Sequence, residues 1–378
     1  MSEPKSIMTR WQSLDALRGW AALLVVLYHA VGQMKGDGGV IIPHIVAPLR
    51  VVASYGFIGV FLFFVISGFC IHLRWAKATA AGKTPDMAFW PFWKRRWRRL
   101  YPPYLIALAI YLGGAAIKGD ITYNSNFVYD LAMHLGMLHN LDKTTVYTMN
   151  SVFWTLAIEE QLYLAYFLLL FVRVRFGWTW TLLMCIAARI GWQLFGIYWA
   201  PTYLGWNVPV NEASAMHWWT WALGALSVEG ALGLVKLPRW SRSWQAGALL
   251  LATGFVWEYV LSQGKHYGAD WYQLFWFFTQ PTWGLAFFCV VNYLVHAERG
   301  WQLRNFWPGW IRGLATVGLF SYSLYLTHEL VLMQDYRFWI LRQSHLFVAF
   351  VVLIPLSVAC AWVFFYLAER PFMNPPKS

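Results

Sequence analysis

Long apolar runs separated by short polar segments extend along almost the whole chain. A helix needs about 20 mostly apolar residues to cross the hydrocarbon core of a membrane. By this criterion the pattern predicts an all-α integral membrane protein with about ten spans, near residues 13–33, 51–73, 100–117, 152–171, 178–198, 214–235, 244–262, 272–295, 314–334 and 346–368. The apolar stretch 127–139 is too short to cross, so we expect an interfacial or re-entrant segment there.

The composition excludes the soluble classes of protein. Of the 378 residues, 59% are hydrophobic and only 12% are charged, whereas soluble domains carry about twice this charged fraction. The longest predicted loop, 118–151, is too short to hold an extra soluble domain, so we expect one transmembrane domain over residues 1–378. The four cysteines show no metal-ligand spacing, and no metal site is predicted.

The charge distribution predicts the orientation. In a soluble protein a net charge of +12 would suggest nucleic-acid binding. In membrane proteins, however, basic residues gather on the cytoplasmic side. Of the 29 lysines and arginines, 20 lie in the termini and in the loops on the same predicted side, and seven lie in the opposite loops. Both termini are therefore predicted to be cytoplasmic, beside anionic membrane lipids, and no nucleic-acid partner is expected.

Ionisable side chains within a span cost a few kcal/mol each on insertion scales, so each is a candidate functional residue. Arg18 and His29 of the first span are eleven residues apart, which places them on one helical face about 16 Å apart along the axis. Arg18 should lie towards the cytoplasm and His29 near the outer end. Catalysis and a packed, hydrogen-bonded role remain alternatives for this pair.

A basic run with the sequence KRRWRRLYPP precedes the third span. Arg96 and Arg99 are three residues apart and share a face if the helix begins early, which would let them grip a phosphate. Anchoring beside lipid headgroups explains the same spacing.

The fourth and ninth spans bring further polar groups into the outer half of the membrane. Glu159 and Glu160 are adjacent and point about 100° apart, so only one should face a given cavity. Such a carboxylate can hold His29 in one tautomer and stabilise its protonated form, or can bond within the bundle to Gln161 or Tyr163. The polar run of the ninth span, Ser321 to Glu329, includes His328 and also ends in the outer half.

Six motifs accompany these residues, in the following order: Leu14-Asp15-x-Leu17-Arg18-Gly19 with His29; Gly59 to Phe69, which includes Ser67; Arg96-x-x-Arg99-Leu100-x-Pro102; Trp154-Thr155-Leu156-x-x-Glu159-x-Gln161-x-Tyr163; Ser321 to Leu326 with His328; and Glu369-x-Pro371. Their order and spacing resemble the membrane-bound acyltransferase 3 family over nearly the whole chain. Thr155 and Leu162 stand where the family usually has serine and phenylalanine.

Bacterial members of that family transfer acyl groups from acyl coenzyme A to hydroxyls of surface carbohydrates and some other acceptors. The resemblance therefore implies an O-acyltransferase of the bacterial inner membrane. It implies that Arg18 and His29 are essential for transfer, that Arg96 and Arg99 contact the acyl donor, and that Glu159 is the carboxylate of the fourth-span motif. Supporting positions are expected at Asp15, Ser67, Tyr163 and His328.

One physical scheme fits these residues and the topology. The coenzyme phosphates would stay on the cytoplasmic side with Arg96, Arg99 and Arg18, while the thioester reaches His29. His29 would act as general base on an acceptor hydroxyl, with Glu159 stabilising the imidazolium; a covalent acyl-histidine is the other route.

The expected transfer is of acetyl, from acetyl coenzyme A, to a surface or exported polysaccharide or a glycolipid. Partners would be a polysaccharide assembly machinery or a second copy of the chain. The alternative function is a multi-pass transporter or flippase for a glycolipid or acyl group.

The acceptor side is less defined by the sequence. Outward segments rich in aromatic side chains can stack on sugar rings, but an interfacial aromatic belt has the same composition. The residues concerned are Trp206, Trp218, Trp219, Trp221, Trp271 and Tyr272.

Overall fold

The computed structural model describes residues 11–32, 51–85, 87–119, 121, 125–264, 269–304, 307–332 and 349–373, and every regular element within these ranges is helical. This confirms the all-α fold. The α-helices are α1 (Gln12–Gly32), α3 (Gly59–Ala80), α4 (Phe89–Lys118), α5 (Ser125–Leu135), α6 (Trp154–Phe176), α7 (Trp178–Leu194), α8 (Ser214–Leu232), α9 (Trp244–Gly264), α10 (Ala269–Leu303), α11 (Gly309–Leu319), α12 (Ser321–Leu332) and α15 (Ile354–Phe364).

Helical structure occupies the described part of all ten predicted spans. Within the described residues, five helical segments are long and apolar enough to cross a membrane: Val51–Ala80, Phe89–Lys118, Trp154–Phe176, Trp178–Leu204 and Val351–Phe372. The count of ten spans and the cytoplasmic placement of both termini remain predictions. The short apolar stretch after the third predicted span forms α5, whose 11 residues extend only about 16 Å.

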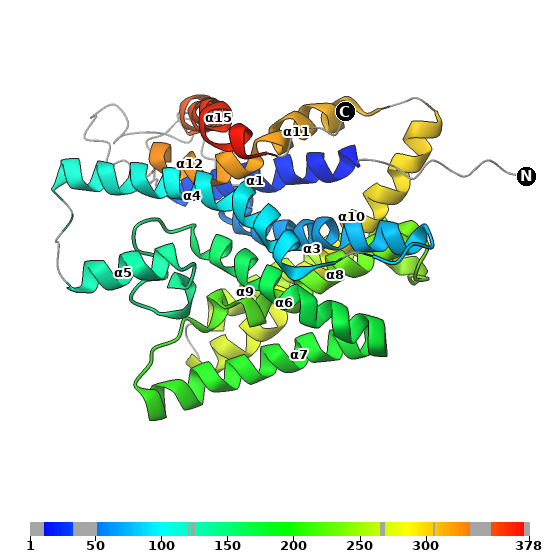
Figure 1. The fold of residues 1–378 in the computed structure, drawn as a ribbon, viewed down its shortest axis with the longest axis horizontal. Coiled ribbons are helices and arrows are strands. Elements are labelled where there is room, and N and C mark those ends of the chain that lie inside the picture. The colour runs from blue at the N-terminus through cyan, green and yellow to red at the C-terminus, as the bar shows by residue number, and fades with distance from the viewer. Residues whose placement is uncertain are drawn as a thin grey trace, which may run out of the picture.

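Helices α1, α4 and α7 run lengthwise and roughly parallel in Figure 1, and α10 crosses the bundle obliquely. In this view α1, α4, α12 and α15 lie in the upper part of the bundle, and α7 lies at the bottom. The short α5 lies at the left end. The apolar core is continuous through the bundle and includes large buried side chains such as Phe64, Tyr166 and Trp221.

Helices α3 and α8 cross closely because small residues face each other at the crossing. A Cβ at Gly68 would meet the carbonyl oxygen of Trp221, and a Cβ at Gly224 would meet that of Val65. Both contacts would be shorter than real Cβ contacts and would involve backbone, which cannot swing aside. Helices in membranes usually associate by close packing through small residues. Lipid tails are as apolar as the helix surface, so the hydrophobic effect does not drive one helix against another there.

We expect Gly68→Ala to destabilise the folded protein by about 1–3 kcal/mol, because the added methyl group must push α3 and α8 apart. Thermal unfolding of the purified protein in detergent measures this loss. Gly114→Ala on α4 is the matched control, since a Cβ there meets nothing within 4 Å. Equal melting temperatures for the two variants would show that the crossing tolerates separation.

A buried ion-pair cluster joins α3, α6, α7 and α8. Glu229, which is fully buried, accepts hydrogen bonds from His72 Nε2 at 2.8 Å and from Trp178 Nε1 at 2.9 Å. Arg173 donates to both oxygens of the same carboxylate, from Nε at 3.0 and 3.1 Å and from one terminal nitrogen at 2.5 Å. A buried charge needs this degree of pairing, and removing one partner leaves the others uncompensated. This cluster was not predicted from the sequence.

The ninth predicted span is broken at Phe320, whose backbone (φ −117°, ψ 21°) leaves the helical region between α11 and α12. A helix that begins inside a membrane exposes backbone N–H groups that water cannot reach. Glu369, at the end of the last helical segment, accepts hydrogen bonds from the Ser323 backbone N–H at 3.1 Å and from its Oγ at 2.5 Å. The carboxylate of the terminal Glu369-x-Pro371 motif thus caps α12.

Candidate functional site

A cavity of about 130 Å³ opens between α1, α3, α4, α6 and α12. About 10–15 Å³ by this measure holds one water molecule, so the cavity has room for several waters or for a slender chain. Its walls are mainly apolar. Each of the six sequence motifs contributes polar side chains to the lining, but the motif histidines His29 and His328 are not part of it. The polar lining residues are Arg18, Ser67, Arg96, Arg99, Thr155, Glu159, Tyr163, Ser321, Tyr322, Tyr325 and Glu369.

Three arginines face this cavity. Helix α4 begins at Phe89, seven residues before Arg96, so Arg96 and Arg99 lie on one face, as their spacing predicts. Arg18 reaches the cavity from α1, where one terminal nitrogen lies 3.4 Å from Asp15 Oδ1 and the other 3.1 Å from Cys70 Sγ. Arginines converging on one cavity form a site suited to an anion.

Glu159 is the carboxylate of the fourth-span motif that faces the cavity. Its hydrogen-bond partners are the hydroxyls of Ser67 and Tyr163, and Arg18 and Arg96 act on it electrostatically. Ser67 also accepts a hydrogen bond from Trp221 Nε1 at 3.2 Å, which links α3 to α8. Ser67 therefore both lines the cavity and contributes to the α3–α8 crossing. The structure therefore brings together Arg18, Arg96, Ser67, Glu159 and Tyr163, but it places none of these contacts at His29.

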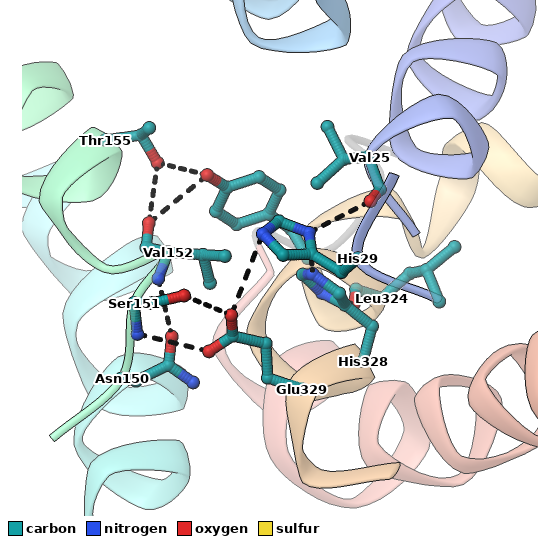
Figure 2. Close-up of polar contacts among 10 residues, drawn as sticks. Val25, His29, Asn150, Ser151, Val152, Thr155, Leu324, His328 and Glu329 are labelled. Carbon is teal, nitrogen blue, oxygen red and sulfur yellow. Dashed lines mark hydrogen bonds and ion pairs between the residues drawn. The ribbon is translucent and has the colours of Figure 1, made fainter. Parts of the chain in front are cut away.

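The partners of His29 are on α12. Its Nδ1 lies 3.0 Å from the carbonyl oxygen of Val25 and 3.2 Å from His328 Nε2, and its Nε2 lies 3.7 Å from Glu329 Oε1. Figure 2 shows the two rings and the carboxylate pointing toward one another. Of the side-chain surface, 17% is exposed at His29 and none at Glu329. His29 is thus the accessible base of the group. The described residues contain no cluster of three or more His, Cys, Asp or Glu that could hold a metal ion.

A hydrogen-bonded tyrosine lies next to both the cavity and this histidine group. Thr155 Oγ1 donates to the Tyr325 hydroxyl at 2.7 Å, and that hydroxyl donates to the Val152 carbonyl at 3.2 Å. Thr155 and Tyr325 line the cavity, while the Tyr325 ring lies 5.8 Å from that of His328. Tyr325 is therefore shared by the arginine-lined cavity and the histidine group.

The loop between α5 and α6 reaches the histidine group through Ser151. His134 and His139 stack with ring centroids 4.0 Å apart; burial, and to a lesser extent His134, lower the pKa of His139 to about 3, so the ring is neutral at physiological pH. Asn140 and Gln161 exchange side-chain hydrogen bonds of 3.2 and 2.7 Å. These contacts fix the segment that leads to Ser151, whose backbone N–H donates to Glu329 at 3.1 Å.

Two of the aromatic residues considered for sugar stacking are not available for it. Trp218 and Trp221 of α8 are buried in the apolar core, because the helix carrying them packs inside the bundle. That expectation was wrong for these two positions. Trp206 and Trp219 are partly buried, and the side chains of Trp271 and Tyr272 lie outside the described residues.

Glu329 is the site residue that the sequence reasoning did not single out. The signal was present: it directly follows His328 in an apolar helix, and an ionisable residue in such a position is a functional candidate by default. Glu159 was preferred because its motif was recognised, and spacing along separate helices does not show which of two carboxylates meets a given histidine.

Comparison with known sequences supports the family resemblance that the motifs indicate. The sequence model of an acyltransferase domain, that of the acyltransferase 3 family, matches residues 11–366. The O-acetyltransferase OatA of Staphylococcus aureus is 30% identical over 168 residues, which is 40% of this chain and 23% of the relative. The peptidoglycan O-acetyltransferase OatA of Listeria monocytogenes is 28% identical over 221 residues, 55% of this chain and 31% of the relative.

The matched region thus spans less than a third of each of these relatives, and no solved structure matches the chain. The family match, by contrast, covers the helices that carry the cavity and the histidine group. On this basis the chain belongs to the acyltransferase 3 family.

Proposed function

We propose that this protein is a membrane O-acyltransferase that moves an acyl group from cytoplasmic acyl coenzyme A to a hydroxyl of a surface or exported polysaccharide or glycolipid. The observation that carries the proposal is the convergence of three arginines on a cavity whose lining includes Tyr325, a residue that also contacts the histidine group of His29 and His328. A donor bound by its anionic end at the arginines would direct its acyl end towards the histidine.

The chemistry of the cavity suits such a donor. Its volume of about 130 Å³ fits a narrow, extended arm and excludes a nucleotide, so the phosphates would remain at the mouth with Arg96 and Arg99. Guanidinium groups bind phosphate oxygens through paired, charge-assisted hydrogen bonds. The apolar walls between the arginines and Tyr325 would accommodate the uncharged part of the arm.

In the proposed step His29 Nε2 takes the proton of the acceptor hydroxyl as the hydroxyl oxygen attacks the thioester carbonyl. The carbon–sulfur bond then breaks, and the imidazolium returns the proton to the leaving thiolate, so that ester and free thiol are the products. Acyl transfer through His29 itself gives the same balance in two steps. Acetyl is the group proposed for transfer, since the relatives are named O-acetyltransferases.

A carbohydrate acceptor is supported by the name of the Listeria relative, which refers to peptidoglycan. We place the protein in the inner membrane of a bacterium, with its acceptor outside and its donor inside. Association with a polysaccharide assembly machinery or with a second copy is part of this proposal.

Reconstitution in sealed vesicles tests the proposed function. Isotope-labelled acetyl coenzyme A is supplied on one side and an exported-type oligosaccharide on the other, and mass spectrometry follows ester formation. We expect label to appear on the oligosaccharide with release of free coenzyme A. Glycolipid movement without consumption of the donor would instead identify a transporter or flippase and overturn the proposal.

A further inference from the structure

Glu329 is a buried carboxylate whose hydrogen-bond partner is Ser151. Oε2 accepts from the Ser151 backbone N–H at 3.1 Å, and Oε1 accepts from the Ser151 hydroxyl. Within the described residues no lysine or arginine forms an ion pair with this carboxylate, and its Oε1 lies 3.7 Å from His29 Nε2. Figure 2 shows the carboxylate directed between Ser151 and the His29 ring.

The hydrogen bonds around the two histidines assign their tautomers. His328 Nδ1 lies 3.0 Å from the Leu324 carbonyl and donates to it, which leaves its Nε2 as an acceptor. His29 Nδ1 lies 3.2 Å from that acceptor and 3.0 Å from the Val25 carbonyl, so Nδ1 carries the proton. His29 Nε2 is then the basic nitrogen, and it is this nitrogen that lies on the side of Glu329.

We propose that Glu329, rather than Glu159, is the positioning residue that stabilises the imidazolium of His29 during acyl transfer. The inference rests on the proposed function. When Nε2 takes the hydroxyl proton, the new N–H faces Glu329 Oε1 across 3.7 Å, and attraction across a buried, low-dielectric gap is strong. In this step Glu329 exchanges no proton: the proton passes from the hydroxyl to Nε2 and then to the thiolate.

The same serine–glutamate contact occurs elsewhere in the molecule without a histidine. Glu298 accepts from the backbone N–H groups of Gln12 and Ser13, at 2.9 and 3.0 Å, and caps α1; Glu369 caps α12 through Ser323. In these two cases the glutamate stabilises the start of a helix by accepting hydrogen bonds from backbone N–H groups. Glu329 differs because its Oε1 also faces the basic nitrogen of an accessible histidine.

Glu159 is unsuited to this role because its charged neighbours are arginines of the cavity and not His29. Arg18 and Arg96 act on it, and Ser67 and Tyr163 donate hydrogen bonds to it. It faces the arginine-lined cavity. The carboxylate that meets the histidine is thus supplied by the helix that also supplies His328.

The test compares Glu329→Gln, Glu329→Asp and wild type in the vesicle assay, with acetyl coenzyme A as donor. We expect Glu329→Gln to lower kcat on the order of 100-fold, since it removes part of the general-base contribution, while KM for the donor stays within twofold. Glu329→Asp keeps the charge and should recover at least tenfold of the loss. Glu258→Gln is the matched control, because Glu258 lies on α9 and contacts Trp283.

Ser151→Ala distinguishes the effect of the Glu329 carboxylate on His29 from its effect on the Ser151 loop. It removes the hydroxyl, but the backbone N–H still holds Oε2, so kcat should stay within threefold of wild type. If Glu329 only caps the loop, Ser151→Ala and Glu329→Gln will lower the melting temperature and the rate together. This second variant remains decisive if Glu329→Gln does not fold.

The inference is overturned if Glu329→Gln retains the wild-type kcat, or if a folded Glu329→Asp is as impaired as the glutamine variant. Failure of the proposed function has a different signature. In that case His29→Ala would also retain full activity, or no variant, wild type included, would form the ester.

Discussion

Replacing His29 by alanine is expected to lower acyl transfer on the order of 10³-fold, within the range that a general base contributes. His29 Nε2 is the accessible basic nitrogen of the histidine group. His328 cannot replace it, because its side chain is fully buried and its Nδ1 is held by the Leu324 carbonyl. The rate of ester formation at saturating donor is the measurement. Donor affinity should stay within about twofold, because the arginines line the cavity and His29 is not one of its lining residues.

Two further variants complete this experiment. His29→Asn keeps a polar group near the position of Nδ1, beside Val25, but supplies no base, so it should be as inactive as the alanine variant while folding more like wild type. His296→Ala on α10 removes an exposed histidine and should be fully active. A His29→Asn protein with the wild-type rate would show that His29 holds the helices together and does not take the proton.

The helices themselves could be predicted from the sequence because one physical requirement dominates them. Backbone groups in a membrane must be paired within the segment, so apolar runs of sufficient length are helical. The break at Phe320 could not be predicted in this way, since residues 314–334 fit a single span by length and mean apolar character. It depends on Glu369, nearly 50 residues later, whose carboxylate caps the interrupted helix.

The candidate site was predictable in its residue types and only partly in its geometry. The spacing of Arg96 and Arg99 predicted a shared face, because both lie on one helix whose geometry is fixed, and both line the cavity. The pairing of His29 depends on how α1 packs against α12, and periodicity within one helix carries no information about its neighbour. The motif therefore directed attention to Glu159, while the structure places Glu329 beside the ring.

The cavity also gives the arginines a more specific interpretation than the sequence allowed. Lys94 and Arg98 belong to the same basic run but are exposed, as expected for residues that anchor a helix among lipid headgroups. Arg96 and Arg99 are partly buried and face the cavity. The run thus has an exposed pair, Lys94 and Arg98, and a pair that faces the cavity, Arg96 and Arg99.

We expect the double variant Arg96→Ala/Arg99→Ala to weaken binding of acyl coenzyme A on the order of 10³-fold. Each hydrogen bond to a charged group contributes about 1.5–3 kcal/mol, and every 1.4 kcal/mol is about tenfold in affinity. Calorimetric titration of the purified protein with acetyl coenzyme A measures the change. Lys94→Ala/Arg98→Ala removes the same charge from the exposed face and should bind the donor as wild type does. Equal losses in the two double variants would mean that the run attracts the donor only through its overall charge, and unchanged binding in both would reduce Arg96 and Arg99 to membrane anchors.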